Sequence, residues 1–119
     1  MNESILTSIK KMLGIPEGYD HFDTDVIIHI NSTLMTVTQL GVGPSNGFHI
    51  TGADETWTDL ISDDLDIQLN SVISLVYLKV KLLFDPNALS GTVIDSMNRQ
   101  ITELEYRIRE AVETASSTE

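Results

Sequence analysis

Apolar residues recur every three or four positions in four stretches of the chain, which is the spacing of one face of an α-helix. The four predicted helices cover about 3–13, 23–40, 69–84 and 92–112. The third has the widest apolar stripe and is expected in the middle of a bundle. The last has a narrow seam of apolar residues alternately three and four apart, which resembles a short coiled-coil seam.

Residues with capping or helix-breaking chemistry set the expected ends of these helices. Asn2 is expected to cap the first helix and Gly14 to stop it. Asp23 is expected to cap the second, with Phe22 as the apolar residue that packs back on the helix. The third helix is expected to stop before Pro86, because proline cannot continue a helix.

Strand-like structure is expected only between residues 42 and 51. Asn46-Gly47 suits a tight hairpin turn, and the segment either forms this hairpin or projects as an extended arm. The run TLMTVTQ inside the second predicted helix alternates and is rich in β-branched residues, so a strand is the alternative there. One or two helical turns are expected around Trp57.

These elements predict a mainly α fold: a single-domain bundle of four to five helices with one short hairpin or extended arm. The domain is expected to cover 1–113, and 114–119 is expected to be a flexible tail. A chain of 119 residues suits one domain with one core.

The charge distribution limits the partners. The net charge is −11, and residues 12–78 hold ten acids and no Lys or Arg. Such a surface repels phosphate, so binding to DNA or to an anionic membrane is not expected. The chain has no cysteine, which excludes disulfides and thiolate chemistry. No signal peptide or transmembrane segment is recognised in it.

Six acids crowd the stretch ADETWTDLISDDLD, namely Asp54, Glu55, Asp59, Asp63, Asp64 and Asp66. Their spacing fails the calcium-loop pattern, which needs a glycine at its sixth position and a glutamate at its twelfth. An acid/base pair against Trp57, or a looser Mg²⁺ or Ca²⁺ site, is the alternative. The favoured interpretation is helix capping, because carboxylates stabilise helix N-termini. No cofactor, metal site or catalytic residue is predicted.

Several sequence pieces resemble one known family when taken in order. They are ILTSIKKMLGI, FDTDVIIHINSTL, QLGVG, FHI, WTD, YLKVKLLFDPN and ELEYRI, and they cover nearly the whole chain. The chain resembles the head–tail connector (adaptor) proteins of long-tailed bacteriophages, the ring proteins beneath the portal. The most specific part is FDPN at the end of a long apolar helix, followed by ELEYRI. Many members have a second proline where this chain has Asn87.

The resemblance implies a structural neck protein and no enzyme. It implies that the protein binds the portal protein and forms a homo-oligomeric ring of roughly twelve subunits, which extends the DNA exit channel between head and tail. The next neck or tail-completion protein is a further expected partner. DNA would pass through without specific binding, and no membrane is involved. The expected location is the neck of the virion, after assembly in the host cytoplasm.

The resemblance also suggests roles for two sets of residues. In this family the C-terminal helix commonly reaches the portal, so the expected portal contacts are Met97, Arg99, Ile101, Leu104, Tyr106, Arg107, Ile108 and Arg109. Alternatively, this helix simply closes the bundle. Two ion pairs are expected along it, Glu103 with Arg107 and Glu105 with Arg109. The six crowded acids either face the channel, where they would keep DNA from adhering, or meet basic patches on the neck partners.

Two other functions compete with the connector. One is a monomeric acidic binding module that occupies a basic cleft on a DNA-binding partner. The other is a small metal-dependent hydrolase that uses Asp59, Asp63 and a histidine. A monomeric binding module has no need of an exposed apolar seam on the last helix. The hydrolase would require a tight ligand set with shifted pKa values.

Overall fold

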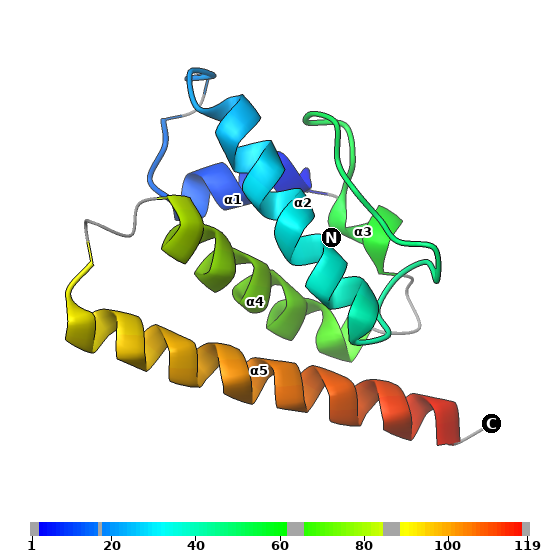
Figure 1. Ribbon diagram of the computed structural model, residues 1–119. Helices are drawn as coiled ribbons and strands as arrows, with labels where there is room; N and C mark the ends of the chain where they lie inside the picture. Colours follow the sequence, from blue (N-terminus) through cyan, green and yellow to red (C-terminus); the bar gives the residue numbers. More distant parts are fainter. Residues whose placement is uncertain (1–2, 17, 62–65, 85–88, 118–119) are drawn as a thin grey trace.

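One central helix, α4 (Asp66–Phe84), lies between α2 (Asp23–Gln39) and α5 (Gly91–Ser117), and all three pack lengthwise (Figure 1). The computed structural model describes residues 3–16, 18–61, 66–84 and 89–117, without the side chains of 66–68 and 115–117. Helix α1 (Ile5–Met12) packs across α2 and α4, and α3 (Trp57–Leu60) is a single turn. The described residues therefore form five helices in one domain, which confirms the mainly α prediction.

The wide apolar stripe of α4 forms the middle of the core. Val72, Leu75, Val76 and Val80 are fully buried between the helices on either side. Helix α4 ends at Phe84, as the proline two positions later predicts. Residues 85–88 themselves lie outside the described part of the chain.

Helix α1 starts from a different cap than predicted. Asn2 lies outside the described residues, and Ser4 occupies the cap position, where its Oγ accepts the backbone N–H of Thr7 at 3.2 Å. The predicted stop is correct, because Gly14 follows the last turn with a φ of 81°, a conformation that glycine adopts without strain.

Helix α2 also differs at its start. Phe22 holds the cap position and no side chain caps the helix, so the prediction that Asp23 is the cap is wrong. Asp23 is the first helical residue, and its carboxylate lies 2.7 Å from the Nζ of Lys10 on α1. A carboxylate is still favourable at this helix end, and here it also joins two helices. The TLMTVTQ run is helical throughout, which excludes the strand alternative.

The predicted hairpin between 42 and 51 is absent. Those residues hold no strand and form a long loop that runs back along α2 from its C-terminal end toward α3 (Figure 1). The Asn31 amide on α2 accepts the N–H of Ile50 at 2.7 Å and donates to its carbonyl at 2.9 Å. Because one side chain satisfies both backbone groups, the segment needs no partner strand at this position.

In the described chain, the strand-like pairing is a single bridge between Ser4 and Thr56. The N–H of Ile5 donates to the carbonyl of Glu55 at 3.0 Å, and the N–H of Trp57 donates to the carbonyl of Glu3 at 3.3 Å. This bridge joins the start of α1 to the start of α3, two sites that are about fifty positions apart in sequence.

Helix α5 runs antiparallel to α4 and is the longest helix (Figure 1). It continues to Ser117, five residues beyond the predicted end at 112. Four of the six residues of the expected tail thus continue the helix, and whether 114–119 moves freely stays a prediction.

Candidate assembly surfaces

The apolar seam of α5 faces the bundle. Met97 and Ile101 are 6% and 8% exposed and Ile108 is fully buried, while Leu104 packs partly buried against the core. Helix α4 covers these residues. This arrangement agrees with the alternative given by the sequence, in which the last helix closes the bundle. A partner could reach this seam only after α5 had moved away from α4.

The other four predicted contacts lie on the outside of α5. Arg99, Tyr106, Arg107 and Arg109 are exposed, and Tyr106 retains 65% of its accessible surface. The predicted set therefore divides into residues that attach α5 to the bundle and residues that face solvent. Helical periodicity produces this division, because positions 99, 106 and 109 are turned away from the seam at 97, 101 and 108.

One of the two ion pairs predicted along α5 is correct. Arg107 donates to Glu103 at 2.7 Å, whereas Glu105 lies 3.3 Å from the Nζ of Lys79 on α4 instead of pairing with Arg109. Glu105 is half-buried at the helix contact, where Lys79 is the nearer cation. Among the described residues, Arg99 and Arg109 have no carboxylate within ion-pair distance.

The carboxylates of Glu110 and Glu113 lie near the Tyr106 hydroxyl. The charge of Glu110 and a hydrogen bond to it, with smaller effects from burial and Glu113, raise the pKa of the Tyr106 hydroxyl above its ordinary value of 10.0. The phenol is therefore neutral in the physiological pH range, and its hydroxyl donates to the Glu110 carboxylate.

Within the described residues, Glu55 and Asp59 of the acidic stretch accept hydrogen bonds from residues three or four positions away. Asp59 and Thr56 form a capping box on α3, in which the Asp59 carboxylate accepts the N–H of Thr56 at 2.9 Å. Glu55 accepts both the N–H and the hydroxyl of Thr51, at 3.0 and 2.9 Å. Asp54 is exposed. The side chains of Asp63, Asp64 and Asp66 lie outside the described residues, so capping of α4 by them stays a prediction.

The hydrogen bonds of Glu55 hold its carboxylate in the ionised form. Partial burial raises its pKa, but hydrogen bonds from its own N–H, from Thr51 and from Gly52 outweigh this effect, and the net pKa lies below 4.5. A general acid at neutral pH requires the opposite shift. Trp57 is fully buried, and its indole N–H donates to the Ser8 hydroxyl at 3.0 Å, so it belongs to the core.

Sequence reasoning missed an exposed face on α2. Ile28, Ser32, Met35 and Gln39 follow one another at helical spacing, all four are exposed and none is charged; we call them the α2 outer face. Ile28 and Met35 keep 58% and 67% of their surface exposed. They lie off the stripe of Ile27, Ile30, Leu34 and Val37 from which the core was predicted, and this offset is the signal in the sequence.

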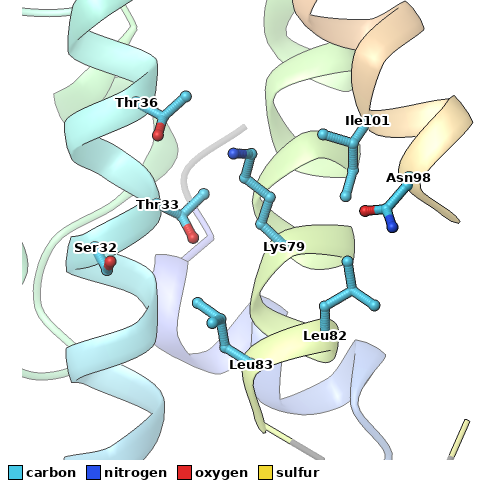
Figure 2. A pocket seen from close by; sticks show the side chains of 8 residues that line it. All are labelled: Ser32, Thr33, Thr36, Lys79, Leu82, Leu83, Asn98 and Ile101. Carbon is cyan, nitrogen blue, oxygen red and sulfur yellow. The ribbon is translucent and has the colours of Figure 1, made fainter. Parts of the chain in front are cut away.

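The α2 outer face forms one wall of a groove. All four of its residues line this groove of about 660 Å³, and the loop 45–49, which includes Phe48, lines the other wall. Ser32 also lines a pocket of about 250 Å³ between α2, α4 and α5. Figure 2 shows Lys79 extending into this pocket between the threonines of α2 and Ile101 of α5.

The described residues form surfaces without a reaction centre. No three His, Asp or Glu side chains among them lie close enough together to hold a metal ion. No helix in the same ranges is long and apolar enough to cross a membrane. What the structure offers is an outward set of arginines and a tyrosine on α5 and an uncharged face on α2.

A family model described as phage connector protein matches residues 5–115. The chain belongs to the phage connector protein family. The match covers nearly the whole chain, so the resemblance found in the sequence is confirmed. Comparisons with curated proteins and with solved structures give no significant match.

Membership in the phage connector family establishes the general role of the protein. The protein is a structural component of head–tail connection and not an enzyme, which confirms that prediction and excludes the hydrolase. As a virion component, a phage connector protein interacts with other parts of the neck.

Proposed function

We propose that this protein is the subunit of a ring that binds the portal and extends the DNA exit channel between head and tail. The observation that carries the proposal is the family match over residues 5–115. Roughly twelve copies are expected, because contacts between neighbouring copies must close into a ring that matches the symmetry of the portal. The next neck or tail-completion protein would bind the opposite side of the ring.

In this proposal the portal binds the outward side of α5, through Arg99, Tyr106, Arg107 and Arg109. Arginine and tyrosine are the residue types that most often dominate binding energy at protein interfaces. Arg99 and Arg109 have no intramolecular ion pair among the described residues and are available to carboxylates of a partner. The buried seam of Met97, Ile101 and Ile108 supports the contact indirectly, because it holds α5 in place on the bundle.

We propose further that the exposed acids of the 54–66 stretch face the channel or the next neck protein. Asp54 and Asp59 are exposed, and residues 12–78 contain no Lys or Arg. Facing the channel, they would repel the DNA backbone. Facing a neck protein, they would orient its basic patches. Either position suits a conduit through which DNA passes without being held.

The experiment is sedimentation of the protein with the purified portal, followed by electron microscopy of the complex. The wild type should co-sediment and form closed rings. Arg99→Glu combined with Arg109→Glu should weaken binding at least about tenfold, because charge reversal at an interface replaces attraction by repulsion. Lys11→Glu is the matched control, since Lys11 is an exposed base on α1, away from α5, that pairs with Glu3.

The melting temperature of each variant shows whether it is folded. A wild type that never associates with the portal would contradict the proposed function itself. If the double variant is folded and binds like the wild type, the portal contact lies elsewhere and the α5 assignment is wrong.

A further inference from the structure

The α2 outer face has no charge, although the chain as a whole is strongly acidic. Between Val26 and Gln39 the helix has no Asp, Glu, Lys or Arg, in a chain whose net charge is −11. Ile28 and Met35 nevertheless expose more than half of their surface. Uncharged positions with exposed apolar side chains mark a surface that another molecule covers.

We propose that this face is the contact between neighbouring copies, and that it docks on the side of α4 that carries Ser74, Tyr77 and Lys81 in the next copy. The inference rests on the proposed ring and adds the surfaces through which it closes. A ring requires two different patches on each subunit, because a patch that pairs with itself produces only a dimer.

The geometry of α4 places the second patch away from the first. Lys79 lines the pocket beside α2, together with Ser32 and Thr36 (Figure 2). Two positions turn an α-helix by about 200°, so Lys81 points to the opposite side of α4. Tyr77 and Ser74 fall on that same side, one and two turns before Lys81. The two patches therefore face different directions, as a head-to-tail contact requires.

The charges at the two patches are complementary. The Lys81 ammonium donates to the Tyr77 hydroxyl at 3.1 Å, and among the described residues no carboxylate pairs with it. At the start of α2, Asp25 is exposed and has no basic partner in the described chain. Near the α4 patch, Glu103 and Arg107 are already paired with each other, so among the described residues Lys81 is the charge without an ion-pair partner. A neighbouring Asp25 supplies the missing carboxylate.

The α2 outer face exposes two large apolar side chains, Ile28 and Met35, which is a small patch and fits a second copy held by a template. A few hundred Å² of exposed apolar surface is about what a monomer tolerates, and a stable standard interface buries about 800 Å² per partner. The contact should therefore be weak between free subunits. Copies held side by side on the portal meet at a raised effective concentration, where a weak contact is sufficient to close the ring.

Absence of native cysteine allows a direct test with engineered thiols. Ser32→Cys places one thiol on the α2 outer face, and Ser74→Cys places one on the α4 patch. Each single variant and the double variant are treated with a short bismaleimide, at high concentration without portal and again with portal. The double variant should give a ladder of covalent dimers, trimers and higher oligomers, and neither single variant should give more than background.

Adding Met35→Asp to the double variant should reduce the ladder at least about tenfold, the loss expected for a central interface residue. Met35 is exposed, so this variant should melt like its parent. A dimer from Ser32→Cys alone would mean that the face pairs with itself, which overturns the proposal. So would a ladder unaffected by Met35→Asp, or no ladder under either condition. Rings on the portal without a ladder would reject this contact and leave the proposed function intact.

Discussion

Single side chains in this protein replace regular secondary structure at the places where the chain leaves its helices. Asn31 binds both backbone groups of Ile50, and Glu55 binds both the N–H and the hydroxyl of Thr51. Between them they fix the second half of the loop that links α2 to α3. Because each satisfies two polar groups at once, the loop has a defined position without a strand partner.

The lowered pKa of Glu55 predicts how the free energy of unfolding changes at acid pH. Its pKa in the folded protein lies below 4.5, the value expected in the unfolded chain. The ionised form therefore contributes stability that is complete above the unfolded pKa and is lost as the pH falls through the lower folded value. Wild type should lose stability more steeply than Glu55→Gln as the pH is lowered through this window.

Urea unfolding at a series of pH values measures this difference, with the emission of the buried Trp57 as the signal. Asp54→Asn is the matched control, since Asp54 is exposed and should follow the wild-type profile. Parallel pH profiles of wild type and Glu55→Gln would show that these hydrogen bonds contribute nothing to stability.

At the scale of elements, the end of α2 and the end of α5 meet at Gly41. This residue has a φ of 96°, and a Cβ at this position would lie 2.8 Å from a methyl carbon of Val112. Two requirements thus coincide: a left-handed turn after α2, and room for α5 to pass. Gly47 has nearly the same φ, 97°, but nothing lies within 4 Å of its Cβ position.

These two glycines form a natural pair for mutation. Gly47→Ala should lower the free energy of unfolding by about 1 kcal/mol through backbone strain alone. Gly41→Ala should lower it by about 2 to 4 kcal/mol, because the crowding against Val112 is added to the same strain. Urea unfolding of both variants measures the difference, and equal losses would mean that α5 does not pack closely on this turn.

How far the elements follow from the sequence depends on whether a local pattern is sufficient. The stripes of α2 and α4 are local, and both helices were predicted. The hairpin failed because Asn46-Gly47 indicates a turn but cannot reveal that Asn31, nineteen residues before Ile50, takes the place of a strand. The seam of α5 was recognised as apolar, but periodicity does not say whether α4 or another protein covers it. The α2 outer face was missed because the exposure of Ile28 and Met35 can be recognised only once the buried side of α2 is known.

For the whole molecule, the separation of charge along the chain decides which partners it tolerates. Residues 12–78 contain ten acids and no Lys or Arg, and Asp20, Asp25 and Asp54 are among the exposed acids. The exposed arginines are confined to α5. Binding to DNA gains its free energy from the release of counterions by bases, which this surface lacks over most of its area.

The wild type should therefore not shift duplex DNA in a gel even at low salt. Asp25→Lys combined with Asp54→Lys changes the net charge from −11 by four positive units, to −7, and should produce weak, salt-sensitive retention. Asp25→Asn combined with Asp54→Asn is the control that removes the carboxylates without adding bases. Salt-sensitive binding of DNA by the wild type would refute the view that its acids keep DNA from adhering.

The packing of α5 on α4 has a mechanical consequence. Ile101 and Ile108 belong to the core that also holds α2, so α5 cannot be drawn off as a separate flap. Detaching it would expose these residues and the side of α4 that they cover, at the cost of part of the free energy of unfolding, which is about 5 to 15 kcal/mol for a whole domain. A subunit anchored through α5 would therefore yield under load at its outer contacts before its own helix gave way. In the proposed ring, the force of DNA moving through the neck would pass through this helix contact into the bundle of each copy.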